Sequence, residues 1–152
     1  MPATASNART SSPTNSASAT RRCYVSRPTL QRMTRPLVIK VTAGSDGPER
    51  CAQAFTVAAL GVASGAEVSL WLTGEASWFA LPDRAEAFEL PHSAPLHELR
   101  DTILAGGRIT LCTQCAARRD ITPDAVLDGI RIAGAQTFLA EVLAEGAQAL
   151  VY

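Results

Sequence analysis

The two cysteines in the stretch LCTQCAARRD are the residues of this chain best suited to covalent chemistry. Cys112 and Cys115 lie three positions apart, where a run of β-formers changes to a run of helix-formers. A thiolate attacks other sulfur atoms, and helix N-terminal N–H groups or nearby arginines favour its formation. Arg118 and Arg119 follow within two turns, and Asp120 opposes them. The pattern therefore predicts a nucleophilic sulfur.

Two other uses of the cysteine pair stay open. Cysteine is a small apolar side chain that is often buried, so packing in a core is one alternative. A Cys-x-x-Cys pair also supplies half of a tetrahedral zinc site. No second pair is present, so Cys51, His92 and His97 would have to complete such a site. We predict a chemical role for the pair, with no metal and no cofactor.

Cys51 and His92 are predicted supporting residues. Cys51 shares a helical stripe with Phe55, which favours a place in the core, but it also lies in the first turn of a helix that could bring it to the thiol pair. His92 follows Pro91 in a long loop, where a histidine near a thiolate can exchange protons.

The composition predicts one soluble domain. The chain has 152 residues, of which 47% are hydrophobic, enough for a single core. Every carboxylate lies at or after Asp46, so residues 46–152 carry all 14 acidic residues against seven arginines. This acidic part is unsuited to nucleic acid. No apolar run approaches the roughly 18 to 20 residues of a membrane span. Four irregularly spaced cysteines favour reduced thiols in the cytoplasm.

Residues 1–35 are predicted to be a disordered N-terminal extension. The first 32 residues are rich in Ser, Thr, Ala, Asn and Pro and hold few large apolar side chains. Their basic, acid-free composition also fits a transit peptide, and a start at Met33 would omit them. These explanations stay open, and Cys23 is assigned no role.

From residue 36 onward, short strands alternate with amphipathic helices. We expect strands in 37–44, 66–74, 108–112, 129–135 and 147–152, and helices in 48–64, 95–107, 114–120 and 136–146. The aromatic segment 75–95 is expected to cover part of the domain, with a short helical turn near 78–81.

This alternation predicts an α/β domain over residues 36–152. Parallel neighbouring strands need crossover connections, so we expect a three-layer domain with a five-stranded, mostly parallel sheet, flavodoxin-like in class. Reactive groups in such sheets collect outside the carboxyl ends of the strands. Cys112 and Cys115 fall at that edge.

The sequence resembles the DsrE family, small α/β sulfur-relay proteins of the DsrE, DsrF and YchN-like group, over about residues 36–152. The likeness rests on LVIKVTAGSDGPERCAQAF, EVSLWLTGEA, LCTQCAARRDITPDAVLDGIRIAGA and the terminal ALVY. The third is the most specific, because family members carry a cysteine after the third strand and then an Ala-rich, Arg-containing helix. Asp120 stands where the family usually has glycine, and aspartate tolerates a left-handed conformation better than most residues.

The resemblance implies that Cys112 accepts sulfane sulfur as a persulfide and passes it on, and that Cys115 matches a second cysteine found in less characterised members. It also implies a sulfur donor or acceptor protein and a homo-oligomer, a trimer or hexamer, in the cytoplasm. Our leading hypothesis is a sulfur-carrier or sulfurtransferase-like protein in which Cys115 resolves or protects the persulfide. The alternatives are a thiol redox sensor with a reversible Cys112–Cys115 disulfide, and a non-enzymatic oligomeric scaffold or ligand-binding protein.

Overall fold

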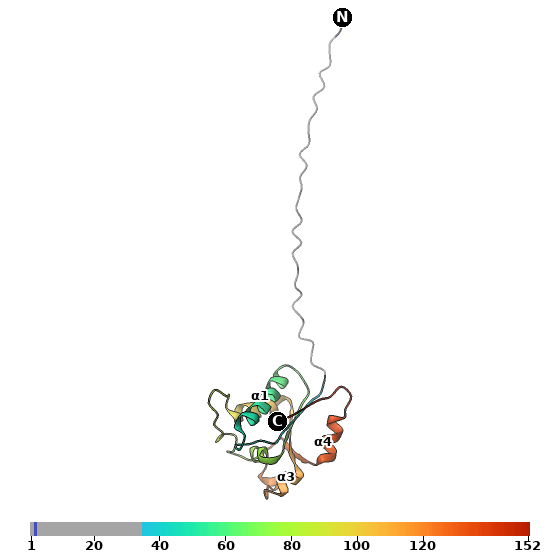
Figure 1. Ribbon diagram of the computed structural model, residues 1–152. Helices are drawn as coiled ribbons and strands as arrows, with labels where there is room; N and C mark the ends of the chain where they lie inside the picture. The colour runs from blue at the N-terminus through green and yellow to red at the C-terminus, as the bar shows by residue number, and fades with distance from the viewer. Residues whose placement is uncertain (1, 3–34) are drawn as a thin grey trace.

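The structure, a computed structural model, describes residue 2 and residues 35–152 (Figure 1). Almost all of the predicted disordered extension, residues 1–35, lies outside the described residues, and so does Cys23. That prediction therefore stays a prediction. Within the described part of the chain, no helix has both the length and the apolar character needed to cross a membrane.

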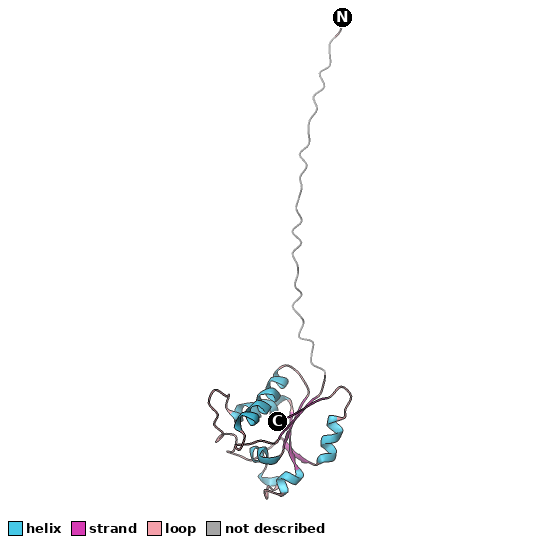
Figure 2. Ribbon diagram, in the orientation of Figure 1, coloured by secondary structure: helices cyan, strands magenta, loops and turns pink. Residues whose placement is uncertain are grey.

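Strands and helices follow one another in the expected alternation in the described part of the chain (Figure 2). The strands are β1 Leu37–Val41, β2 Val68–Leu72, β3 Arg108–Cys112, β4 Ile130–Ala133 and β5 Gln148–Val151. The α-helices are α1 Pro48–Ala63, α2 Leu96–Gly106, α3 Thr113–Ala117 and α4 Ala135–Val142. Two 3₁₀ helices, η1 Gly74–Ala80 and η2 Pro123–Ala125, lie in the connections.

The sheet is parallel throughout, with the strand order β4-β3-β2-β1-β5. The chain adds strands in one direction from β1 to β4 and then returns across the sheet to β5. Because crossovers between parallel strands are right-handed, this return places α4 on the face opposite α1, as Figure 1 shows. The expected three-layer α/β domain with a five-stranded sheet is confirmed.

The main core lies between the sheet and the helices α1 and α2. Alternate strand residues point to the same face, and Ile39, Leu70 and Leu111 are fully buried on this side. From α1, Cys51 and Phe55 pack into the same cluster. Burial of each large apolar side chain stabilises the fold by about 1.5 to 3 kcal/mol.

The segment between η1 and α2 covers one end of this core. The rings of Phe79 and Phe88 pack edge to face with centroids 5.6 Å apart. The buried guanidinium of Arg100, on α2, donates hydrogen bonds to both carboxylate oxygens of Glu86, at 2.8 and 3.3 Å. These hydrogen bonds lower the pKa of the Glu86 carboxyl. The covering segment is therefore fixed to η1 by apolar packing and to α2 by an ion pair.

Helical structure after β2 begins earlier than the sequence predicts. The expected turn covered residues 78–81, whereas η1 starts at Gly74, separated from the end of β2 only by Thr73. Gly74 has a φ of +53°, a left-handed conformation that turns the chain out of β2. The residues that follow are thereby brought to the carboxyl edge of the sheet.

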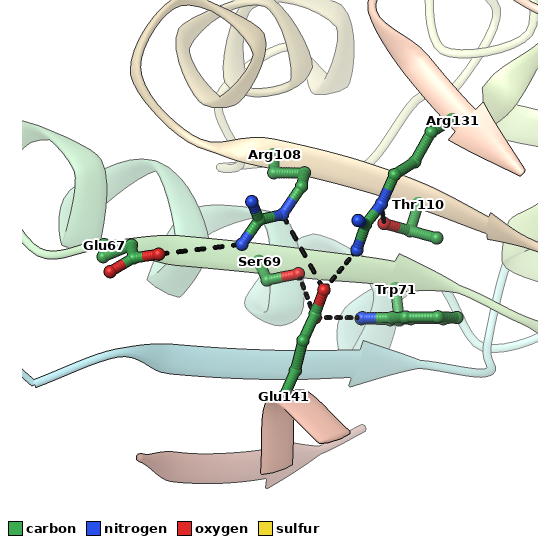
Figure 3. Close-up of polar contacts among 7 residues, drawn as sticks. All are labelled: Glu67, Ser69, Trp71, Arg108, Thr110, Arg131 and Glu141. Carbon is green, nitrogen blue, oxygen red and sulfur yellow. Dashed lines mark hydrogen bonds and ion pairs between the residues drawn. The ribbon is translucent and has the colours of Figure 1, made fainter. Parts of the chain in front are cut away.

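Polar contacts hold α4 to the opposite face of the sheet (Figure 3). The Oε2 atom of Glu141, on α4, accepts hydrogen bonds from Ser69 Oγ at 2.7 Å and from Trp71 Nε1 at 2.8 Å. The Oε1 atom of Glu141 binds Arg131, whose Nε donates to Thr110 Oγ1 at 2.8 Å. No residue of α4 itself is buried. This carboxylate is therefore a principal attachment of α4 to the sheet.

Candidate functional site

The structure places Cys112 and Cys115 at the carboxyl edge of the sheet. Cys112 ends β3 and stands immediately before α3, and Cys115 lies within that short helix. Both are free thiols. Cys115 is only 8% exposed, whereas Cys112 is half-buried. Cys112 is therefore the sulfur that a partner can reach more easily.

The start of η1 forms a wall beside Cys115. The backbone N–H of Gly74 donates a hydrogen bond to Cys115 Sγ at 3.3 Å. A Cβ atom at position 74 would lie 2.6 Å from the carbonyl oxygen of Thr42, so the backbones approach too closely for a side chain. Glycine meets both this demand and the positive φ without strain. The turn after β2 thus positions an N–H group at the sulfur.

Ser77 belongs to the same wall. Its side chain is fully buried, and its Oγ makes no well-formed hydrogen bond with any described residue. It lies close enough to Cys115 to lower the pKa of that thiol by hydrogen bonding. A buried hydroxyl without a partner costs about 1 to 3 kcal/mol. An ionised Cys115 sulfur offsets this cost, because it accepts a hydrogen bond from the Ser77 hydroxyl.

Of the two predicted arginines, Arg119 contacts the thiol segment. Its Nη1 donates to the carbonyl oxygen of Cys115 at 3.3 Å, and its Nη2 binds Glu75 Oε1 at 2.6 Å. Glu75 also accepts a hydrogen bond from Trp78 Nε1 at 3.2 Å. Arg118 is exposed. Both arginines were predicted to act on the thiol pair, but only Arg119 contacts the thiol segment.

Opposing effects set the pKa of Cys115. Burial is the largest, and it raises the pKa. The remaining effects lower it, and they are hydrogen bonds with Gly74, Cys112 and Ser77 and the positive charge of Arg119. Together they hold the pKa of the Cys115 thiol below its ordinary value. A thiol of this kind ionises more readily near neutrality and is a better nucleophile there.

Cys51 does not share these properties. Its side chain is fully buried in the apolar cluster on α1. Burial, with a smaller effect of the Asp46 carboxylate, raises the pKa of Cys51 to about 12. The thiol therefore stays protonated near neutrality. The structure supports the core interpretation of Cys51 and not a supporting role beside the reactive pair.

His92 lies in a different part of the surface. It is exposed with a φ of +62°, and it lines a hollow of about 380 Å³ between α1 and the covering segment. The lining of this hollow includes neither Cys112 nor Cys115. The predicted proton exchange between His92 and a thiolate therefore has no support in the geometry. Among the described residues, no group of three or more His, Cys, Asp or Glu side chains is arranged to hold a metal ion.

The chain belongs to the DsrE/DsrF-like family, whose sequence model matches residues 36–152. This family is associated with sulfur relay. The match confirms the resemblance, and Asp120, where the family usually has glycine, adopts a left-handed φ of +53°. No curated protein sequence gives a significant match.

The solved structures that share this fold include the following two. The YchN protein of E. coli superposes with a TM-score of 0.65 at 16% identity, covering 79% of this chain and 100% of its own. MTH1491 of Methanobacterium thermoautotrophicum, a protein of unknown function, superposes with a TM-score of 0.59 at 9% identity, covering 78% of this chain and 99% of its own. At these identities the likeness shows the fold alone.

Sequence reasoning missed Gly74, Glu75 and Ser77, because it placed Gly74 at the end of a strand and treated the segment 75–95 as a cover. One signal was present in the sequence. A glycine followed by polar residues stands at the end of a strand, and the carboxyl ends of parallel strands share one edge. The strand order, which decides whether β2 and β3 are neighbours, was needed to use it.

Proposed function

We propose that this protein carries sulfane sulfur as a persulfide on Cys112, as a sulfur-carrier or sulfurtransferase-like protein. The observation that carries the proposal is the pair of free thiols at the carboxyl edge of β3, with the more open Cys112 beside the buried Cys115. The association of the family with sulfur relay also supports it.

The transfer step is a thiolate exchange. The Cys112 thiolate attacks the terminal sulfur of a donor persulfide, R–S–SH. A new S–S bond forms at Cys112, the donor S–S bond breaks, and the donor leaves as its thiolate. The proton stays on the terminal sulfur. Attack by an acceptor thiolate on that sulfur then discharges Cys112. The cargo keeps its oxidation state, so the cycle needs no oxidant or reductant.

A redox sensor is the second candidate, and the proximity of the two thiols favours it. Cys112 and Cys115 lie close enough for a hydrogen bond between their side chains to lower the pKa of Cys115. Under oxidation this pair would lose two hydrogens and form a reversible disulfide. The difference between the two functions is whether the pair gains sulfur or loses hydrogen.

Intact mass measurement after incubation with a persulfidated albumin tests the proposal. The donor is too large for its sulfur to reach a buried thiol. In a Cys23→Ser background, we expect the chain to gain the mass of one sulfur atom, Cys115→Ser to gain it too, and Cys112→Ser to gain none. Cys51→Ala is the matched control and should behave as the background chain.

Each other outcome identifies an alternative. A gain of sulfur by Cys112→Ser would overturn the assignment. Loss of two hydrogens in place of sulfur uptake would favour the redox sensor. Thiols at positions 112 and 115 that react only after denaturation would favour a non-enzymatic scaffold.

We also propose that the chain forms a homo-oligomer, a trimer or hexamer, and exchanges sulfur with a donor or acceptor protein in the cytoplasm. Leu139 on α4 and Leu143 directly after it are 55% and 73% exposed, and Val151 on the edge strand β5 is 66% exposed. A second copy of the chain would bury these apolar side chains. Free thiols at all three described cysteines fit a reducing compartment.

Light scattering tests the assembly. We expect the particle mass of the unmodified chain to be three or six times 16.0 kDa, and Leu143→Asp to reduce it. Leu60→Asp is the matched control, because Leu60 is 61% exposed but lies on α1, on the opposite face of the sheet. A monomeric unmodified chain would rule out the oligomer.

A further inference from the structure

We propose that Ser77 is a positioning residue for Cys115, and that its buried hydroxyl and the N–H of Gly74 hold the Cys115 sulfur as the resident thiolate of the pair. The assignment of Ser77 stands on its own. An internal exchange step between Cys115 and Cys112 rests on the proposed persulfide on Cys112.

The Ser77 hydroxyl is buried without a well-formed hydrogen bond to any described residue. Nearly all buried polar groups in proteins are hydrogen-bonded, and an exception needs a reason. Ser77 is fully buried, and its Oγ makes no well-formed hydrogen bond with a described residue. The sulfur of Cys115 lies beside it. A neutral thiol is a weak acceptor, whereas a thiolate is a strong one. The hydroxyl is thus arranged for the ionised sulfur.

A second donor converges on the same atom from the same element. The N–H of Gly74 points at Cys115 Sγ over 3.3 Å. Its direction is fixed, because Gly74 has a φ of +53° and contacts the backbone of Thr42 too closely to admit a side chain. Donors held in place before a charge develops stabilise that charge without reorganisation. Gly74 and Ser77 together form such an arrangement.

The charged side chains near Cys115 partly cancel each other's effect on its pKa. Arg119 faces the thiol segment from beyond α3, and Glu75 faces Arg119 from η1 at 2.6 Å. This ion pair neutralises much of the charge that Arg119 offers to the sulfur. The hydrogen bonds of Gly74 and Ser77 each lower the pKa of Cys115 more than Arg119 does. Removal of the Ser77 hydroxyl should therefore raise the pKa of Cys115 by a measurable amount.

A resident thiolate at Cys115 permits an internal exchange with Cys112. The Cys115 thiolate attacks the terminal sulfur of the Cys112 persulfide, the S–S bond to Cys112 breaks, and Cys112 leaves as a thiolate with the proton kept on the terminal sulfur. The reverse step restores the starting state. Because Gly74 and Ser77 stabilise a thiolate at Cys115, they favour the side of this equilibrium on which Cys115 is the thiolate and Cys112 carries the sulfane sulfur. The cargo is thereby kept on the sulfur that an acceptor protein can reach.

The test uses a full-length chain in which Cys115 is the single thiol, with Cys23→Ser, Cys51→Ala and Cys112→Ser. The rate of alkylation by iodoacetamide is measured as a function of pH, with and without Ser77→Ala. We expect an apparent thiol pKa below that of an ordinary cysteine in the parent chain, and in Ser77→Ala a higher pKa with alkylation at neutral pH slowed by a few fold. Ser77→Thr keeps the hydroxyl and should restore the lower value.

Two controls separate positioning from a general effect on folding. Ser69→Ala removes another buried hydroxyl, one that binds Glu141 on the opposite face of the sheet, and it should leave the pH profile unchanged. Ser77→Ala removes a hydroxyl that is proposed to bind only the ionised sulfur, so at a pH where the Cys115 thiol is protonated its Tm should equal that of the parent. If Ser77→Ala does not fold, Ser77→Gly supplies a second chain without the hydroxyl.

The results distinguish this inference from the proposed function. A pH profile that ignores the hydroxyl at position 77, or that responds equally to Ser69→Ala, would overturn the assignment even if Cys112 takes up sulfur. A profile that depends on Ser77 in a chain that takes up no sulfur would support the assignment and remove the persulfide function.

Discussion

The backbone N–H of Gly74 donates its hydrogen bond to the Sγ atom of Cys115 over 3.3 Å, joining the end of β2 to the helix after β3. The two strands pair in parallel, with Leu72 opposite Leu111. The residues that follow them are therefore neighbours at one edge of the sheet. The reactive sulfur depends on two connections that are about 40 residues apart in the chain.

Substitution of Gly74 should disturb both stability and the thiol. We expect Gly74→Ala to lower the free energy of unfolding by about 1 to 3 kcal/mol, because alanine at φ +53° is strained and its Cβ would lie 2.6 Å from the Thr42 carbonyl oxygen. The displaced N–H should also raise the pKa of Cys115. Urea denaturation and iodoacetamide alkylation measure the two effects.

Gly134→Ala is the matched control for this substitution. Gly134 has a φ of −95°, and a Cβ there would meet nothing within 4 Å. Its change in unfolding free energy should be about 0.5 kcal/mol or less. Equal stability of Gly74→Ala and Gly134→Ala would contradict the close approach of the turn to Thr42.

The two neighbouring arginines should differ in their effect on the thiol. Arg119→Gln removes a positive charge that lowers the pKa of Cys115, so we expect that pKa to rise by less than about 1 and alkylation at neutral pH to slow by a few fold. The rise is limited because Glu75 already pairs with Arg119. Arg118→Gln, at an exposed position, is the control. Similar slowing by both substitutions would show that long-range charge, and not contact, sets the reactivity.

Local patterns predicted the elements of the fold. The alternating apolar residues of β2 and the β-branched run of β3 identify strands, and amphipathic spacing identifies α1 and α2. The strand order could not be predicted in this way. The flavodoxin order 2-1-3-4-5 arises from the same alternation, whereas this chain adopts β4-β3-β2-β1-β5. The two orders differ in the face of the sheet on which each crossover helix packs. Packing across the whole domain decides that choice.

The site was predictable only where it is local in sequence. Cys112 and Cys115 belong to one short motif at a strand end, so their spacing was visible. Ser77 was not, because it stands beside Trp78 and Phe79 in a stretch whose aromatic residues indicate a cover. Its role depends on the strand neighbourhood of β2 and β3. Cys51 was ambiguous for a similar reason, since its first-turn position and its apolar stripe indicate different environments.

Native thiol counting should identify Cys51 as the unreactive cysteine. With a pKa raised to about 12 by burial and, to a smaller extent, by Asp46, it holds a negligible thiolate fraction at pH 8. In a Cys23→Ser chain we expect two thiols to react with an aromatic disulfide reagent before denaturation and a third only afterwards. Cys51→Ala should show two thiols under both conditions. Three reactive thiols in the native chain would place Cys51 at an open edge.

Attachment of α4 should depend on pH through Glu141. Burial raises the pKa of this carboxyl, but hydrogen bonds from Trp71, Ser69 and Arg131 outweigh it, so the pKa is lower in the folded chain than in the unfolded chain. A carboxyl of this kind contributes stability above its unfolded pKa of about 4.3, and the contribution is lost as pH falls through the folded pKa.

Glu141→Gln should therefore lower the free energy of unfolding by about 1 to 3 kcal/mol at pH 7, because the Arg131 contact loses its charge and one oxygen acceptor becomes an amide donor. Stability curves of the parent and the variant should converge as pH falls below about 4. Glu145→Gln, at an exposed position after α4, should leave the curve unchanged. Curves that stay parallel down to acid pH would mean that the ionised carboxylate does not hold the helix. In that case the apolar contact of Trp71 with Phe138, whose ring centroids are 5.3 Å apart, would have to hold α4 to the sheet.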